Sequence, residues 1–342
     1  MTESPPLVRA EGLSVSFRVS RGRGGGSHVI RAVDDVSLTV SRGEILGLVG
    51  ESGSGKTTLG QVLVGLLRPG QGRVLFDGTD IWTARGQDRR ALRRRMQVVF
   101  QESRGSLNPR MRVESIIGEG LKVQGLGDRE ERSRRVREVA AQVGLGSASL
   151  RRYPHQFSGG QRQRIGIARA LAVQPEFLVA DEPVASLDVS VQAQVLNVLL
   201  DLRSELGLTY ILISHDLAVV ERVSTRIAVM YMGQIMELGP AGDVFSRPQV
   251  PYTYALLSAR PTVPGRERYD RVVLPGDVGQ PGQERAGCPF APRCWKAAEV
   301  CRQSAPALAQ VRPGHWAACH FAGDLSVHQP GPSARVGQDA VP

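Results

Sequence analysis

The stretch GESGSGKT, from Gly50 to Thr57, decides the fold that we predict for this chain. It follows the short apolar run EILGLV and opens the helical pattern TTLGQVLVGLL, so it predicts a strand, a tight loop and a helix in succession. In that context the spacing G-x-x-x-x-G-K-[ST] is typical of a loop whose backbone N–H groups wrap phosphates at a helix N-terminus. We therefore expect an α/β domain with Lys56 at the β- and γ-phosphates and the Thr57 hydroxyl at Mg²⁺.

The composition indicates a globular protein and argues against nucleic acid as the partner. The chain has 342 residues, of which 41% are hydrophobic and 22% charged, and no apolar run or N-terminal apolar segment predicts a membrane span or a secretory signal. The net charge of +10 comes almost entirely from arginine, because lysine occurs only at positions 56, 122 and 296. Arginine-rich segments such as Arg129–Glu138 interleave acidic residues and lack nucleic-acid-binding aromatic motifs, which favours solvated helix faces.

The apolar pattern predicts alternating strands and helices. The first forty residues alternate apolar and polar side chains around a loop at Arg21–Ser27, which predicts strands. Two further buried strands are expected at Phe177–Pro183 and Thr209–Asp216, with an amphipathic helix between them, whereas Glu102–Leu150 looks helical and charged. Parallel strands joined by helices predict a wound sheet with its ligand at the carboxyl ends of the strands.

Polar residues at predicted strand ends fit phosphoryl chemistry. FLVADE places Asp181, a carboxylate for Mg²⁺, and Glu182, a group that can polarise water, at the end of a buried strand. Gln101 follows MQVVF and His215 follows ILIS, so we expect Gln101 near Mg²⁺ and the attacking water and His215 near the γ-phosphate. Phe17, in LSVSF, is either a core residue or a platform for adenine, and we favour the second interpretation.

SGGQ, at Ser158–Gln161, precedes an arginine-rich helical pattern, and such a helix start suits an anion. With SLD at Ser186–Asp188 and the motifs above, the order over about residues 8–246 resembles the nucleotide-binding subunits of ATP-binding cassette (ABC) transporters. The resemblance implies a P-loop NTPase cassette: a RecA-like wound sheet, an antiparallel β subdomain and an α-helical subdomain at about 102–170. It also implies two cassettes dimerised head to tail.

The resemblance assigns roles to individual residues. Glu182, His215 and Gln101 are the implied catalytic residues, with Thr57, Gln101 and Asp181 at Mg²⁺. SGGQ would bind the γ-phosphate of the partner's ATP, and Asp188 would communicate across the interface. The residues expected at ATP are Phe17, Gly50, Ser52, Gly53, Ser54, Gly55, Lys56, Thr57, Thr58, Gln101, Ser158, Gly159, Gly160, Gln161, Asp181 and Asp188.

Finer resemblance points to the oligopeptide and dipeptide importers, through segments such as Gln101–Leu121 and Pro248–Leu257. It favours the second of the two ATPases in that branch, and so a sister ATPase over an identical copy as partner. It implies two membrane permeases, an extracytoplasmic substrate-binding protein, no nucleic acid, and a peripheral place on the cytoplasmic side of the membrane. An importer of nickel chelates or another small solute, a soluble ABC ATPase acting on nucleic acid or ribosomes, and a non-hydrolysing ATP-binding module are the alternatives.

The composition becomes rich in proline and glycine after Pro248, and Cys288, Cys294, Cys301 and Cys319 all follow. We expect a cassette at 1–250, a C-terminal extension at 251–321 and a disordered tail at 322–342. Disulfides fit a cytosolic ATPase poorly, and four clustered thiols suit a tetrathiolate centre. The segment resembles the extension of peptide-importer ATPases, some of which hold a [4Fe–4S] cluster on such cysteines. We favour a structural cluster of that kind over zinc or free thiols.

Overall fold

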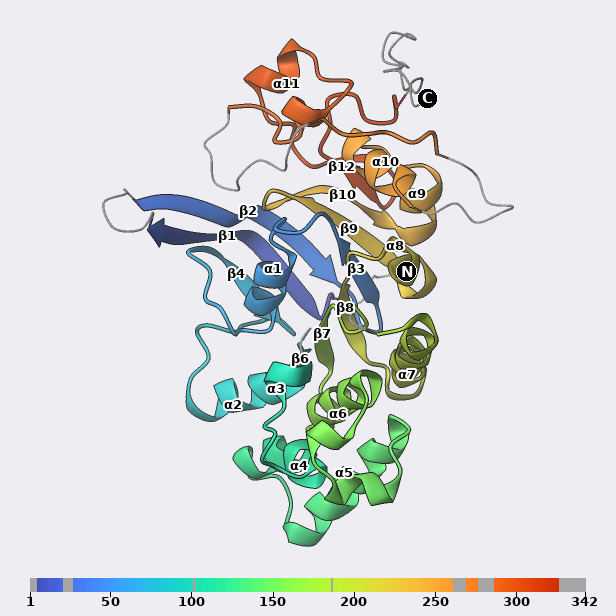
Figure 1. Ribbon diagram of the computed structural model, residues 1–342. Coiled ribbons are helices and arrows are strands. Elements are labelled where there is room, and N and C mark those ends of the chain that lie inside the picture. Colours follow the sequence, from blue (N-terminus) through green and yellow to red (C-terminus); the bar gives the residue numbers. More distant parts are fainter. Residues whose placement is uncertain are drawn as a thin grey trace, which may run out of the picture.

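The structure is a computed structural model that describes residues 5–20, 27–100, 103–185, 187–260, 269–275 and 286–325. Figure 1 shows a helical region at one end, two sheets in the middle and the C-terminal segment at the other end. Within these ranges no helix has both the length and the apolar character that crossing a membrane requires.

Eight strands form the central sheet: β3 (Ile45–Val49), β6 (Met96–Val99), β7 (Phe177–Asp181), β8 (Thr209–Ile213), β9 (Arg226–Tyr231), β10 (Gln234–Pro240), β11 (Ala309–Arg312) and β12 (His315–Ala317). Their order is β11-β12-β10-β9-β3-β8-β7-β6. The five strands from β9 to β6 run parallel, and the other three are antiparallel to their neighbours. The predicted wound parallel sheet is therefore confirmed, with an antiparallel edge that the sequence did not indicate.

Both faces of the parallel strands are buried, which explains their continuous apolar runs. Every residue of β3, β7 and β8 is buried. Successive side chains on a strand point to opposite faces. Leu46 and Leu48 accordingly join the apolar cluster with helix α1 (Lys56–Leu63), whereas Ile45 and Val49 join the cluster on the other face with α7 (Val189–Leu206) and α8 (Leu217–Val223).

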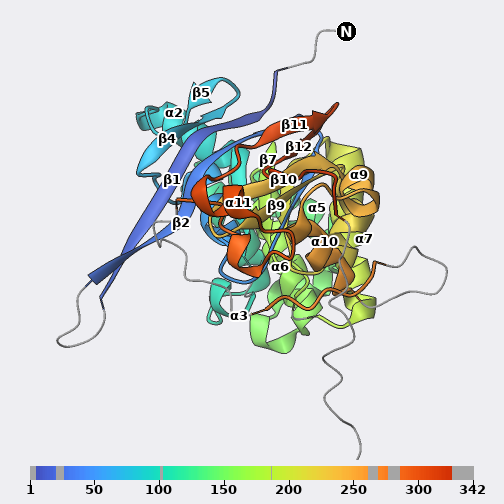
Figure 2. The same ribbon diagram turned by 90° about the horizontal axis from the view of Figure 1, so that it is seen from above.

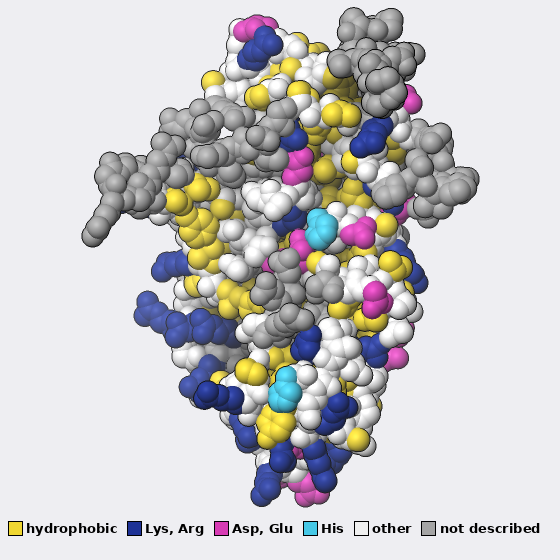
Figure 3. Space-filling view, in the orientation of Figure 1, with side chains coloured by type: hydrophobic (Ala, Val, Ile, Leu, Met, Phe, Trp, Pro, Cys, Tyr) yellow, Lys and Arg dark blue, Asp and Glu magenta, His cyan; other side chains and the backbone are white. Residues whose placement is uncertain are grey.

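A second, antiparallel sheet has the order β2-β1-β4-β5 and covers the α1 face of the central sheet. Its strands are β1 (Val8–Ser20), β2 (Ser27–Val40), β4 (Gln71–Phe76) and β5 (Thr79–Asp80). The arginine-rich helix α2 (Gly86–Arg95) follows it and buries only Leu92. Figure 3 shows Lys and Arg side chains gathered along one edge and at the helical end of the molecule, as expected for solvated arginine faces.

The helical region follows β6. It consists of α3 (Ser103–Ser106), α4 (Val113–Val123), α5 (Arg129–Gln142), the 3₁₀ turns η1 (Ser147–Arg151) and η2 (Pro154–Gln156), and α6 (Gly159–Ala172). Ile117 of α4, Val139 of α5 and Ile165 of α6 are fully buried in one apolar cluster. At the start of α5 a capping box between Asp128 and Glu131 satisfies free backbone N–H groups. The predicted helical character of Glu102–Leu150 is thus confirmed over its described residues.

The C-terminal extension shares the core of the cassette. It includes α10 (Pro251–Ser258), η3 (Ala291–Arg293) and α11 (Glu299–Gln303), and α9 (Ala241–Ser246) precedes it in the cassette. Strand β12 pairs with β10 through Leu238 opposite Trp316, and Figure 2 shows the extension lying over this part of the sheet. Tyr252, just beyond the predicted boundary at residue 250, is fully buried. The boundary predicted from composition therefore crosses a continuous core.

The start of the predicted disordered tail is packed against this core. The Gly323 N–H donates to the Gln249 carbonyl at 3.1 Å, and Lys296 Nζ lies 2.6 Å from Asp324 Oδ1. Disorder was therefore wrong for residues 322–325, because two long-range polar contacts hold them. Residues 326–342 lie outside the described part of the chain.

Candidate active site

GESGSGKT and the following Thr58 (residues 50–58, the P-loop) lead from the end of β3 into the start of α1, as the motif predicts. Gly50 and Gly55 have φ angles of 152° and 103°, a region that side chains rarely adopt. A Cβ atom at Gly50 would lie 2.1 Å from the Met230 carbonyl oxygen, and one at Gly55 would lie 2.0 Å from that of Ala32. Only glycine fits at these two positions, and with glycine there the loop can press against β9 and β2.

Lys56 folds back onto this loop. Its Nζ donates to the carbonyls of Gly50 at 2.8 Å and Glu51 at 2.9 Å, and it lies 3.3 Å from Ser54 Oγ. The side chain is 6% exposed, and burial lowers the pKa of Lys56 while Glu182, Asp181 and Glu51 raise it. Buried cations need paired acceptors, so these carbonyls hold the ammonium where an incoming phosphate can take it over.

Asp181 ends β7 beside the first residues of α1. Its Oδ1 accepts a hydrogen bond from Thr57 Oγ1 at 3.2 Å, and the residue is buried. Burial raises the pKa of Asp181, the Thr57 hydrogen bond opposes that rise, and the neighbouring Glu182 adds to it. A carboxylate and a hydroxyl oxygen together are hard ligands of the kind that Mg²⁺ prefers, so this pair fits the predicted Mg²⁺ position.

Glu182 and His215 meet at the carboxyl ends of β7 and β8. His215 Nδ1 lies 3.0 Å from Glu182 Oε1, and the His215 side chain is 60% exposed whereas that of Glu182 is 16% exposed. Glu182 has a φ of 45°, and its N–H donates to the Ile213 carbonyl at 2.9 Å. A strained backbone thus aims the carboxylate at the histidine instead of at solvent.

SGGQ forms the N-terminus of α6, in the helical region of Figure 1 and on a different element from the P-loop. Ser158 Oγ accepts from the Gln161 N–H at 3.3 Å, and Gln161 Oε1 accepts from the Ser158 N–H at 3.1 Å. A Cβ at Gly160 would lie 2.1 Å from Val191 Cγ1, so α7 approaches the helix start too closely for any side chain. The resulting helix start can bind an anion, as its sequence predicts.

Asp188 begins α7 next to this helix start. Its Oδ1 accepts from the Val191 N–H at 2.9 Å and from Ser190 Oγ at 2.7 Å. The Ser190 hydrogen bond first, and then that of the Val191 N–H, lower the pKa of Asp188. Asp188 thus serves as the N-cap of α7 within this chain. The sequence predicts a role for it across a dimer interface and does not predict this cap.

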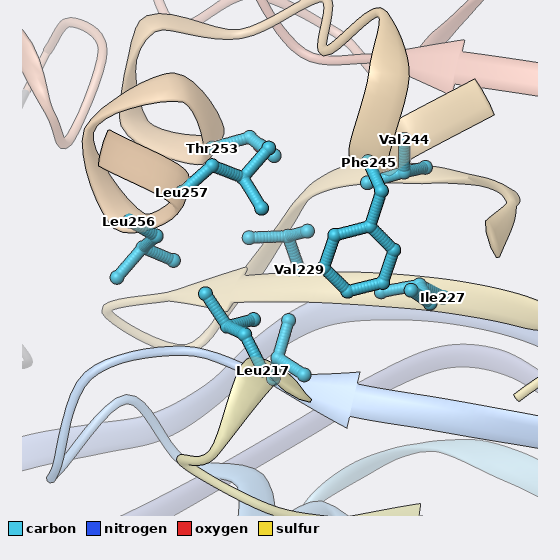
Figure 4. Close-up of a pocket in the computed structure, with 9 residues that line it drawn as sticks. Leu217, Ile227, Val229, Val244, Phe245, Thr253, Leu256 and Leu257 are labelled. Carbon is cyan, nitrogen blue, oxygen red and sulfur yellow. The ribbon is translucent and has the colours of Figure 1, made fainter. Parts of the chain in front are cut away.

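Of Phe17 and Gln101, the structure describes only Phe17. Phe17 lies on β1, is 41% exposed and lines an open groove with Arg31 and Arg68, which no P-loop residue lines. Gln101 and Ser186, from the VFQ and SLD motifs, lie outside the described residues, although β6 ends just before Gln101 as predicted. A small cavity elsewhere, of about 10 Å³, is walled by apolar side chains including Leu217 and Phe245 (Figure 4), and its size excludes a ligand.

The four cysteines are free thiols in the extension. Burial raises the pKa of Cys294 to about 12 and that of Cys319 to about 11, and the neighbouring cysteines add to both shifts. Burial also raises the pKa of Cys288, with Cys301 contributing. Across the described ranges, however, no group of three or more His, Cys, Asp or Glu side chains could hold a metal ion. The [4Fe–4S] prediction is therefore not confirmed.

Glu51 is a site residue that sequence reasoning missed. It lies inside the P-loop, and its carboxylate forms a two-pronged ion pair with Arg293 of the extension, at 2.7 and 3.1 Å. The two residues are 242 positions apart, and no periodicity or motif links them. Glu51 could have been singled out only as the one charged residue, besides Lys56, in the glycine-rich loop.

Comparison with known proteins agrees with this geometry. The family model described as ABC transporter matches residues 33–185, and that described as oligopeptide/dipeptide transporter, C-terminal region, matches residues 236–301. A protein of Brucella ovis named as a peptide import ATP-binding protein is 49% identical over 319 residues, which cover 93% of this chain and 98% of the relative. One of Brucella abortus with a corresponding name is 51% identical over 316 residues, covering 92% and 94%.

Solved structures share the fold. A dimeric bacterial ABC transporter cassette matches with a TM-score of 0.61 and 27% identity, over 68% of this chain and 98% of that one. A dimeric post-hydrolysis state of the same cassette, bound to ADP and Pi, matches equally well. A cassette of Clostridium perfringens that is part of the transporter complex cbiONQ has a TM-score of 0.61 and 28% identity, over 71% and 92%.

Proposed function

This chain belongs to the ATP-binding proteins of ABC transporters that carry the oligopeptide/dipeptide C-terminal region, and we propose that it hydrolyses ATP to power import of di- or oligopeptides. The observation that carries the proposal is the convergence of Lys56, Thr57, Asp181, Glu182 and His215 at the carboxyl ends of neighbouring parallel strands. Similarity to peptide import ATP-binding proteins along nearly the whole chain supplies the substrate class.

The residues divide the reaction among themselves. The P-loop, residues 50–58, binds the phosphates, with Lys56 turning from its own carbonyls to the β- and γ-phosphate oxygens. Thr57 and Asp181, together with Gln101, would hold Mg²⁺, which when bound draws charge from the transferring phosphoryl group. Glu182 polarises the attacking water, and His215, which it holds at 3.0 Å, contacts the γ-phosphate. Phe17 stacks on adenine.

A head-to-tail dimer completes each site. In this arrangement Ser158–Gln161 of one cassette binds the γ-phosphate held by the P-loop of the other, and Asp188 lies at the interface. Support comes from the anion-binding helix start of α6, from its place on a different element from the P-loop, and from the similarity to a dimeric cassette. ATP then joins the two cassettes, and hydrolysis loosens them. We propose that the partner is a sister ATPase.

The dimer works on the cytoplasmic side of the cell membrane. There it binds two membrane permeases, and an extracytoplasmic binding protein delivers the peptide. The comparisons do not favour the soluble ABC ATPase acting on nucleic acid or ribosomes, because the relatives are named for peptide import. Import of nickel chelates or another small solute remains the alternative within the same branch.

The decisive variant is Glu182→Gln, which keeps the shape of the side chain and removes its charge. We expect ATP hydrolysis to fall by about a hundredfold or more, because the water loses its base, while an ATP-bound dimer accumulates. Glu138→Gln, at a half-exposed carboxylate on α5, is the matched control and should hydrolyse normally. Unchanged turnover of Glu182→Gln would contradict the assignment of the base.

Transport is tested with the complete complex. The chain, its sister ATPase and the two permeases are placed in proteoliposomes with the binding protein, and uptake of labelled di- and oligopeptides is compared with uptake of nickel chelates. ATP-dependent accumulation of peptide supports the proposed substrate class. Accumulation of nickel chelates alone would assign the alternative.

For the extension we propose that Cys288, Cys294, Cys301 and Cys319 hold a [4Fe–4S] cluster. The support is that the cysteines lie close together: the Cys288 N–H donates to the Cys301 carbonyl at 2.8 Å, and Cys301 contributes to raising the pKa of Cys288, Cys294 and Cys319. As placed, they do not make a metal site, so binding would require them to lose protons and move together. Iron and sulfide analysis with visible absorption of anaerobically purified protein tests this. A colourless, iron-free protein with normal ATPase activity excludes the cluster, and zinc in its place assigns the second interpretation.

A further inference from the structure

Glu51 is held at three points inside the phosphate-binding loop. Its carboxylate accepts two hydrogen bonds from the Arg293 guanidinium, with Nη1 at 2.7 Å and Nη2 at 3.1 Å. Its N–H donates to Tyr252 Oη at 2.9 Å, and its carbonyl accepts from Lys56 Nζ at 2.9 Å. Two of these three contacts come from residues beyond position 250, so the C-terminal extension contacts the loop directly.

Arg293 is placed by a packed turn. It closes η3, whose N–H at Arg293 donates to the Phe290 carbonyl at 3.0 Å. The Phe290 ring packs against Tyr231 of β9 and Tyr252 of α10, with centroids 5.4 and 5.3 Å away, and the ring centroids of the two tyrosines are 4.6 Å apart. These large rings leave the turn little freedom, so the guanidinium is pre-positioned at Glu51.

The ion pair is well shielded from water. The Arg293 side chain is 11% exposed and that of Glu51 is 21% exposed. Glu51 and Tyr231 both raise the pKa of Arg293, so the guanidinium stays charged. At such exposure a fork-shaped arginine–carboxylate pair is stronger than an open surface pair. Removing one member would leave the other charge partly buried and without its counter-ion.

The negative charge of Glu51 acts on Lys56, which is expected to bind the phosphates. The carboxylate contributes to raising the pKa of Lys56, the residue that binds the β- and γ-phosphates. The same negative charge that stabilises the Lys56 ammonium would repel a triphosphate that enters the loop. Arg293 cancels that charge at a distance of 2.7 Å.

We propose that Arg293 is a positioning residue for ATP, which neutralises Glu51 and fixes the P-loop at this residue, so that the C-terminal extension sets the nucleotide affinity of the site. It acts through Glu51 and does not touch the reacting atoms. The proposal does not depend on the transported cargo, because ATP binding is measured on the purified chain alone.

The test is Arg293→Ala, measured by titration with a fluorescent ATP analogue in the presence of Mg²⁺. We expect the Kd for nucleotide and the KM for ATP to rise roughly tenfold, because an uncompensated carboxylate faces the phosphates, while kcat changes little. Arg302→Ala is the matched control, since Arg302 is an exposed arginine of the same extension that pairs with Glu299 of its own helix. Its nucleotide affinity should equal that of the wild type.

The sharper test removes the charge that Arg293 compensates. In the double variant Glu51→Gln/Arg293→Ala, most of the lost affinity should return, and Glu51→Gln alone should bind nucleotide no more weakly than the wild type. A merely structural contact predicts the opposite, since both variants would still lack the ion pair. If the double variant binds as weakly as Arg293→Ala, or if Arg293→Ala binds as tightly as the wild type, the proposal is wrong.

Folding is followed in parallel by thermal denaturation. Where Arg293→Ala does not yield folded protein, Arg293→Gln carries the same test, because glutamine keeps a polar reach to Glu51 but has no charge. Arg293→Lys, which keeps the charge and loses the fork, should retain an affinity between those of the wild type and Arg293→Gln. Equal affinities of Arg293→Lys and Arg293→Gln would contradict a role for charge.

Discussion

The P-loop receives side chains from two regions of the molecule by different routes. Asp181 and Glu182 reach Thr57 of this loop because β3, β8 and β7 lie in that order and run parallel, so that their carboxyl ends share one edge of the sheet. Arg293 reaches the same loop across 242 positions, from a short turn wedged by aromatic rings. Backbone topology therefore assembles the first set, and side-chain packing assembles the second. The chemistry of the first should tolerate little change, whereas the second should adjust affinity.

The largest effect is expected at the centre of the first region. Lys56→Ala should lower ATP hydrolysis by about a hundred- to a thousandfold, because it removes the cation that binds the β- and γ-phosphates. Lys122→Ala, on the exposed side of α4, changes the same residue type and should leave the rate unchanged. Steady-state ATPase assays measure both. If both variants lose activity to a similar extent, the loss does not come from removing the cation at the phosphate site.

The packing of the second region is tested by thiol reactivity. Because burial raises the pKa of Cys294 to about 12 and of Cys319 to about 11, few thiolates exist near neutral pH. In metal-free protein we expect alkylation by iodoacetamide to be about a hundredfold slower than in the unfolded chain, and to quicken as the pH approaches these values. Mass spectrometry follows each cysteine. Rapid alkylation of Cys294 at neutral pH would show that the extension is not packed.

Two glycines of α6 can be compared: Gly160 lies against Val191 of α7, and Gly166 has no neighbour at its Cβ position. Gly160→Ala should destabilise the protein by about 2 kcal/mol, because the new methyl group meets Val191 at 2.1 Å. Gly166→Ala, in the same helix with nothing within 4 Å of its Cβ position, should stabilise it by roughly 0.5–1 kcal/mol. Chemical denaturation measures both. Equal effects of the same sign would contradict the close packing of α6 against α7.

The smallest expected effect is on the folding stability of the nucleotide-free protein. Burial raises the pKa of Asp181, so this group stabilises the fold below its ordinary pKa and loses that contribution as the pH rises through the raised value. At neutral pH the ionised carboxylate is therefore a cost, and Asp181→Asn should raise the nucleotide-free stability by about 1 kcal/mol while lowering Mg²⁺-dependent hydrolysis. Thermal scans between acidic and neutral pH measure this. A variant that is less stable than the wild type at neutral pH would contradict the sign.

Prediction from sequence succeeded where the pattern is local. The apolar runs before Gly50 and Glu182 marked buried strands, and the glycine-rich loop marked the strand-to-helix turn. It failed at the C-terminal side, where composition suggested a separate extension from residue 251 and disorder at residues 322–325. There β12 joins β10, and Gly323 is held by Gln249, through pairings between residues far apart in the chain.

The sequence by itself determined the type of fold and the order of the motifs, and it predicts which residues face the phosphates. These depend on short-range periodicity and on spacing within one loop or strand end, which can be seen without knowing what packs nearby. Only the tertiary structure decided that Lys56 rests on its own loop, that Glu182 is strained toward His215 and that Arg293 grips Glu51. Such contacts arise from the close packing of distant segments, and no local pattern records them.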